Sequence, residues 1–193
     1  MDTLLSDFIP DFDLFSFLTK EEMEYSRNFF KRTKLKKGDF LSKEGDICKK
    51  IAIVRSGILR SFYNKDDEQL TTYFNIEGTI ATALRSYLKE VPAYENMQAV
   101  TDVEIFYIEK KDMNKLFEDI PAWNKIVRIA METLYVKMEE RSISLQYNTA
   151  KERYLNFLVE FPNLANRIPL QYIASFLGIT PETLSRIRKS LLT

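Results

Sequence analysis

From about Asp112 onward the apolar residues of this chain recur with a helical period, and that change from the strand pattern before it restricts the fold more than any other feature. Before it, short runs of β-branched and aromatic residues predict strands, because such side chains suit a pleated, half-buried surface. These runs are residues 51–54, 58–63, 70–74 and 103–108. After it, apolar residues recur at three- and four-residue spacings, which is typical of helices. We therefore expect an α+β protein with an N-terminal antiparallel β-barrel or jelly roll.

Turn signals separate the predicted strands and support the barrel. Four of the five glycines lie at these turns, where the missing Cβ makes a positive φ inexpensive: Gly38, Gly45, Gly57 and Gly78. Before the first strand, Thr19 and Glu22 have the spacing of a helix capping box. This pair predicts a short helix that continues to about Arg32.

The composition argues against an enzyme. Histidine is absent, which excludes Ser-His-Asp and Cys-His catalysis, histidine-ligated haem and most catalytic zinc sites. Cys48 is the single cysteine, so it supports neither an intramolecular disulfide nor an iron–sulfur or zinc site. The 28 acidic and 28 basic residues suit a solvated surface. We expect no catalytic residues, no metal and no cofactor.

No membrane contact is expected either. No run approaches the ~20 consecutive apolar residues that span a bilayer. The N-terminal segment is acidic and lacks the basic start, apolar run and cleavage site of a secretory signal. These features predict a cytoplasmic protein.

A long helix is predicted over residues 121–147, with too many apolar residues for a single stripe. Five of them follow three- and four-residue steps with a final seven-residue step, which suits a seam with a second copy of the helix: Val127, Met131, Leu134, Met138 and Leu145. The alternative is a central helix buried within one subunit. The pattern favours a homodimer with a barrel domain at 1–120, a dimerisation helix at 121–147 and a further domain at 148–193.

Residues 168–191 have the layout of two short helices joined by a tight turn. Pro169 suits the first turn of the first helix, and Gly178 lies just past its end. Thr180 is a good N-cap for the second helix, with Pro181 at its first position. Apolar side chains give the two helices a buried face: Ile173, Ala174, Leu177, Leu184, Ile187 and Leu191.

The opposite face of the second predicted helix carries Glu182, Ser185 and Arg186 at i, i+3 and i+4. A guanidinium can donate two hydrogen bonds to guanine, a carboxylate can accept one from cytosine, and a hydroxyl can reach a base or a phosphate. In a helix-turn-helix, the N-terminal end of this helix enters the major groove of DNA. The remaining predicted DNA contacts are Thr180, Thr183, Arg188 and Lys189, the last two to phosphates.

Charge and context favour this interpretation over an ordinary solvated helix. The chain has a formal net charge of zero, but from Lys151 onward it has six basic and three acidic residues. The positive charge therefore lies on the segment that is predicted to meet phosphates. An ordinary polar face would explain any one of the three side chains, but it explains the set and its turn less well.

Over nearly its whole length the chain resembles the Crp/Fnr family of bacterial regulators. Lys37-Gly38, Glu44-Gly45-Asp46 and Ser56-Gly57 resemble the turns of the family's cyclic-nucleotide-binding-type barrel. The long helix resembles its dimer helix, and Glu182-x-x-Ser185-Arg186 resembles the recognition helix of the Fnr-like branch. The resemblance implies a homodimeric transcription regulator that binds a GA-containing palindrome in double-stranded DNA, with RNA polymerase as a further candidate partner.

The sequence departs from the family at the effector site. Members that bind cyclic AMP hold its ribose and phosphate with a Gly-Glu pair and an Arg-Ser pair. This chain has other residues at those places: Thr82, Ala83, Ala93 and Tyr94. A buried phosphate without its arginine would be left unpaired, so cyclic AMP is not the expected effector.

A different effector remains open at this place. Arg85, with Ser86 and Tyr94, is a candidate site for another anion, although a surface or salt-bridged arginine is the more common situation. Two further family features are missing from the sequence: the N-terminal cysteine cluster of oxygen sensors, and the wing hairpin after the recognition helix. The competing interpretation is a small-molecule-sensing or protein-interaction barrel whose tail does not bind DNA.

Overall fold

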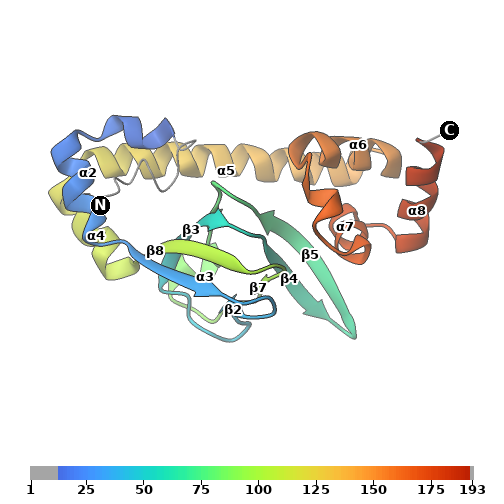
Figure 1. Ribbon diagram of the computed structural model, residues 1–193, viewed down its shortest axis with the longest axis horizontal. Helices are drawn as coiled ribbons and strands as arrows, with labels where there is room; N and C mark the ends of the chain where they lie inside the picture. Colours follow the sequence, from blue (N-terminus) through green and yellow to red (C-terminus); the bar gives the residue numbers. More distant parts are fainter. Residues whose placement is uncertain (1–12, 192–193) are drawn as a thin grey trace. The chain divides into compact units, whose positions relative to one another are not determined.

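The computed structural model describes residues 13–191 and confirms an α+β fold with an antiparallel β-sandwich, a long helix and C-terminal helices (Figure 1). The elements are η1 (Asp13–Phe17), α2 (Lys20–Arg27), β1 (Lys31–Leu35), β2 (Phe40–Ser42), β3 (Lys50–Ser56), β4 (Leu59–Lys65), β5 (Glu68–Asn75), β6 (Ile80–Ala81), α3 (Leu84–Lys89), β7 (Asn96–Ala99), β8 (Val103–Glu109), α4 (Lys110–Asp119), α5 (Ala122–Tyr147), α6 (Ala150–Glu160), η2 (Leu164–Asn166), α7 (Leu170–Leu177) and α8 (Pro181–Ser190).

Two four-stranded sheets form the sandwich, with strand orders β1-β8-β3-β6 and β2-β7-β4-β5. The four predicted apolar runs coincide with β3, β4, β5 and β8, apart from Ile58, which immediately precedes β4. Buried side chains of β3, β4 and β8 meet those of β2, β6 and β7 in one cluster, which includes Leu41, Val54, Leu59, Met97 and Ile105. The sequence did not predict β7, because this four-residue strand contains no β-branched or aromatic side chain.

The capping box at the first helix is confirmed, but the predicted end of that helix is wrong. The backbone N–H of Thr19 donates to Glu22 Oε2 at 2.8 Å, and the backbone N–H of Glu22 donates to Thr19 Oγ1 at 3.2 Å. Helix α2 ends at Arg27, and Arg32 lies in β1, opposite Phe106 of β8. Pairing with β8 therefore outweighs the helical preference of the residues after Arg27.

A second apolar cluster joins η1, α2, α4 and the first turns of α5 to β3 and β8. Trp123 lies at its centre and is 3% exposed. Its indole Nε1 donates to Ser26 Oγ at 2.8 Å, which satisfies the polar atom of a buried ring. The ring of Phe15 meets Trp123 edge to face.

The contacts of the chain divide it into two compact units. The first unit comprises residues 13–63 and 73–131, and the second comprises residues 64–72 and 132–191. Helix α5 passes from one to the other. Among the residues that the structure describes, no helix is both long enough and apolar enough to cross a bilayer.

The C-terminal helices follow the predicted pattern closely. Helix α6 begins with a capping box in which Glu152 Oε2 accepts from the backbone N–H of Thr149 at 2.7 Å. Pro169 is the N-cap of α7 rather than a residue of its first turn. Gly178 ends α7 with φ at +64°, in the left-handed region that glycine favours.

Candidate nucleic-acid interface

Helices α7 and α8 form a helix-turn-helix pair whose apolar faces are buried. The turn between them is closed by the backbone N–H of Ile179, which donates to Ala174 O at 3.0 Å. Ala174 and Leu184 are fully buried, and Ile173 is 1% exposed. Because these side chains fix one face of each helix toward the interior, the other face of α8 is turned to solvent.

Two arginines attach the end of α7 to the helices before it. Arg153 of α6 donates through Nε to Leu177 O at 2.9 Å and through Nη1 to Asn148 O at 2.7 Å. Arg141 of α5 donates through Nη2 to Phe176 O at 2.9 Å, and its guanidinium carbon lies 3.8 Å from the centre of the Phe176 ring. Cations at the last carbonyls of a helix also interact favourably with the negative end of its dipole. The two arginines therefore fix α7, and with it the turn that carries α8.

The solvent face of α8 carries the residues that the sequence predicted for base contacts. Glu182, Ser185 and Arg186 are all exposed, while Leu184 between them is buried. Lys189 is also exposed, and Arg188 is half-buried. The structure therefore brings the three base-contact candidates together on one accessible side of the helix N-terminal half.

Hydroxyl groups organise the first turn of α8. Thr180 caps the helix, and its Oγ1 accepts from the backbone N–H of Thr183 at 3.2 Å. The hydroxyl oxygens of Thr180 and Thr183 are 3.2 Å apart, and Arg186 Nη2 donates to Thr183 Oγ1 at 3.3 Å. The backbone N–H of Glu182 and the Thr180 hydroxyl both hold the pKa of the Glu182 carboxyl below its ordinary value. Glu182 is therefore charged at neutral pH.

The predicted seam residues lie along α5 with different exposures. Val127, Met131 and Leu134 are half-buried, and Val127 packs against the cluster around Trp123. Met138 is 62% exposed. Leu145 is 44% exposed and also lies beside the turn of the helix-turn-helix, since a Cβ built on Gly178 would come 3.6 Å from its Cδ2.

Tyr135 was not among the predicted seam residues, although it is 70% exposed and lies three and four residues from Met138 and Met131. Its spacing was visible in the sequence, so this signal could have found it. The two arginines at the end of α7 were also missed. They had no sequence signal, because their partners are backbone carbonyls up to 35 residues away.

The effector candidates lie at helix α3, which the sequence did not predict. Arg85 is exposed, and its guanidinium carbon stacks 4.1 Å from the centre of the Tyr94 ring. Ser86 is 1% exposed and links the backbone at Cys48 to the backbone at Val91. Its Oγ accepts from the backbone N–H of Cys48 at 2.8 Å and donates to Val91 O at 2.6 Å. The structure therefore brings Arg85 and Tyr94 together and places Ser86 away from them, in the interior.

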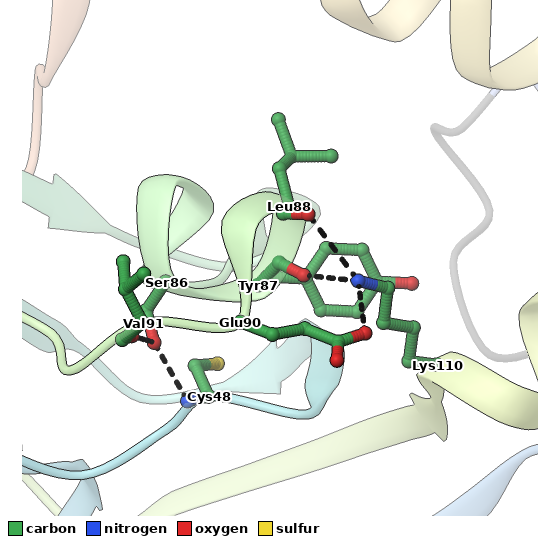
Figure 2. A network of polar contacts seen from close by, with 7 residues as sticks. All are labelled: Cys48, Ser86, Tyr87, Leu88, Glu90, Val91 and Lys110. Carbon is green, nitrogen blue, oxygen red and sulfur yellow. Dashed lines mark hydrogen bonds and ion pairs between the residues drawn. The ribbon is translucent and has the colours of Figure 1, made fainter.

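Lys110 holds the other end of α3 (Figure 2). Its Nζ donates to Tyr87 O at 2.8 Å and to Leu88 O at 3.3 Å, and it pairs with Glu90 Oε1 at 2.7 Å. The hydrogen bond and charge of Lys110 lower the pKa of the Glu90 carboxyl. Among the described residues, no group of three histidine, cysteine, aspartate or glutamate side chains is placed to hold a metal ion.

Comparisons with known proteins agree with this architecture. Residues 32–119 match the cyclic nucleotide-binding domain model. The transcriptional activator protein anr of Pseudomonas aeruginosa is 27% identical over 186 residues, which cover 88% of this chain and 74% of that protein. The FnrA activator of Stutzerimonas stutzeri is 25% identical with the same coverage.

Solved structures show the same fold. FixK2 from Bradyrhizobium japonicum superposes with a TM-score of 0.71 at 21% identity, over 84% of each chain. A regulator from Eubacterium rectale, described as a putative member of the crp/fnr family, gives 0.69 at 17% identity over 93% of this chain and 86% of its own. The relatives from Pseudomonas aeruginosa and Stutzerimonas stutzeri are named as transcriptional activators and not as enzymes. In its barrel domain, and over most of its length, this chain is therefore similar to Crp/Fnr-type transcription regulators.

Proposed function

We propose that this regulator binds a specific palindromic DNA site as a homodimer and that α8 is its recognition helix. The observation that carries the proposal is the joint exposure of Glu182, Ser185 and Arg186 beside the buried Leu184, on a helix whose N-terminal end is capped. A guanidinium, a carboxylate and a hydroxyl on one helix face supply the donors and acceptors that base edges require. The relatives named as transcriptional activators support the same function.

The test begins with selection of bound duplexes from a random oligonucleotide pool. The affinity of the selected duplex is then compared with that of a scrambled duplex at one salt concentration. Arg186→Ala should cost about 1–3 kcal/mol on the selected duplex and relax the preference at one base pair, whereas Lys189→Ala should weaken both duplexes alike. Equal effects of the two substitutions on both duplexes would refute the assigned roles.

The competing function is a sensing or protein-binding barrel whose tail does not engage DNA. Binding to phosphates weakens steeply as salt is added, even on random sequence. If the protein does not retard a scrambled duplex in a gel at low salt, the result would therefore favour the competing function. Retardation that disappears with salt would favour the regulator.

The dimer proposal rests on α5. Exposed Tyr135 and Met138, with Met131 and Leu134 half-buried beside them, form an apolar line of the kind that a second copy covers. Two-fold symmetry then sets two recognition helices about 34 Å apart, one turn of DNA. Met138→Glu should give a monomer in sedimentation, while Glu139→Gln, an exposed neighbour outside the line, should remain dimeric. A dimer that persists in Met138→Glu would contradict this use of α5.

The effector proposal is that the barrel does not take cyclic AMP. In support, Ser86 is engaged with backbone groups on both sides, and Arg85 stacks on Tyr94 at the surface. Neither side chain is therefore placed around a buried phosphate. Titration with cyclic AMP and cyclic GMP should give no calorimetric signal and no change in the affinity for the selected duplex. Saturable binding of either nucleotide would overturn the proposal.

A further inference from the structure

The start of α8 contains two threonine hydroxyl groups within hydrogen-bond distance of each other, one of which also contacts Arg186. Arginine carries only donors, so in the contact of Arg186 with Thr183 the threonine oxygen must accept. The proton of the Thr183 hydroxyl is then available for Thr180 Oγ1, 3.2 Å away. Thr180 Oγ1 also accepts from the backbone N–H of Thr183, and the Thr180 hydroxyl helps to lower the pKa of the Glu182 carboxyl. The hydrogen bonds therefore connect the guanidinium of Arg186 to Thr183 and bring the hydroxyl of Thr180 beside it.

These hydrogen bonds restrict the orientation of the Arg186 side chain. An exposed arginine has several rotatable bonds and loses rotamer freedom when it must meet one base. The bond to Thr183 directs the guanidinium toward the N-terminal end of α8, the end that enters a major groove. It occupies one of five N–H donors, so two parallel donors remain for guanine.

We propose that Thr183 is a positioning residue for base recognition, which acts by holding Arg186 in the orientation that meets its base. The inference rests on the proposed function, because it assigns a role within the same recognition helix. Thr183 is half-buried, whereas Glu182 and Arg186 on either side of the turn are exposed. Its hydroxyl contacts Arg186 and Thr180 within the helix. Its role in DNA binding is to make base recognition by Arg186 selective.

Thr183→Val tests the hydroxyl alone. Valine keeps the β-branched shape, and the capping bond from the backbone N–H of residue 183 to Thr180 is retained. The measured quantity is the ratio of affinities for the selected duplex and the scrambled duplex. Loss of one hydrogen bond should lower this ratio about threefold to tenfold. Thr183→Ser retains the acceptor and should stay within about twofold of the wild type.

A double-mutant cycle separates positioning from direct contact. In an Arg186→Ala background, Thr183→Val should cause no further loss of selectivity. If Thr183→Val lowers both affinities equally, or lowers the selective one by the same factor without Arg186, Thr183 acts on DNA or on the fold directly and the inference is wrong.

The cycle also distinguishes this inference from the proposed function. If Arg186→Ala lowers the ratio and Thr183→Val leaves it intact, only the positioning role fails. If Arg186→Ala leaves the ratio intact, base recognition by this helix face fails and the positioning role fails with it. Circular dichroism of each variant should match the wild type, because every changed atom lies on the helix surface or in its first turn.

Discussion

Arg153→Met should destabilise the second unit, because it removes the bonds that join α7 to the helices before it. The two bonds, to Leu177 O and Asn148 O, are each made by a charged donor. Removing such a donor costs about 1.5–3 kcal/mol when the carbonyl is left unsatisfied. Both carbonyls lie at or next to a helix end, and methionine keeps the aliphatic packing of the arginine side chain. We therefore expect a total loss of about 2–4 kcal/mol, a large part of the roughly 5–15 kcal/mol of a typical domain.

Urea unfolding measures this loss, with far-ultraviolet circular dichroism reporting the helices of the second unit. The single tryptophan, Trp123, lies in the first unit, so its fluorescence should be affected less. Lys151→Met is the matched control, since Lys151 is exposed near the start of the same helix and its loss should change stability by less than about 0.5 kcal/mol. Equal midpoints for the two variants would refute the role assigned to Arg153.

Three further predictions concern the first unit. Gly57→Ala should lower the free energy of unfolding by at least about 2 kcal/mol, because the new Cβ would lie 2.2 Å from Asp102 O at a φ of +92°. Gly45→Ala is the control, since Gly45 has a similar φ of +89° with open space around it, and it should cost about 1 kcal/mol. Equal losses in urea unfolding would contradict the steric argument. Ser86→Ala leaves two backbone groups without their partner and should cost about 1–3 kcal/mol, and an unchanged melting temperature would count against the bridge. Burial raises the pKa of Tyr87 to about 12, so Tyr87→Phe should remove an ultraviolet tyrosinate signal near pH 12. Since this pKa is raised on folding, the stability linked to Tyr87 is fully present below about pH 10 and is lost as the pH rises through 12, and a late signal that persists in the variant would refute the assignment.

The recognition helix could be predicted in detail because its determinants are consecutive in sequence. Gly178, Thr180 and Pro181 each act within a few residues of their own position: a left-handed helix end, an N-cap and a first helical residue. The same locality explains why the Thr19 capping box was correct. The end of α2 was wrong for the opposite reason, since Arg32 is held in β1 by β8, more than 70 residues away. Local chemistry fixes where a helix begins, but a strand partner elsewhere can decide where it ends.

The effector candidates show the same limit for a site. Arg85 and Ser86 are adjacent in sequence, and their residue types alone suggested an anion site. In the structure, Ser86 points inward to the backbone of Cys48, 38 residues away, while Arg85 lies at the surface on Tyr94. No pattern of spacing reports such pairings, because each depends on how α3 packs against the strands.

The two candidate sites therefore differ in what their polar groups do within the chain. At α3, Ser86 and Lys110 direct their hydrogen bonds to backbone carbonyls and to Glu90, so these groups stabilise the loop that contains them. At α8, the bonds of Arg186 and Glu182 run along the helix surface and leave most guanidinium donors and carboxylate lone pairs facing solvent. More hydrogen-bond donors and acceptors are therefore available to a binding partner at α8 than at α3. For this reason we place recognition of a partner at the C-terminal helix, and we expect substitutions at α3 to change stability before they change DNA selectivity.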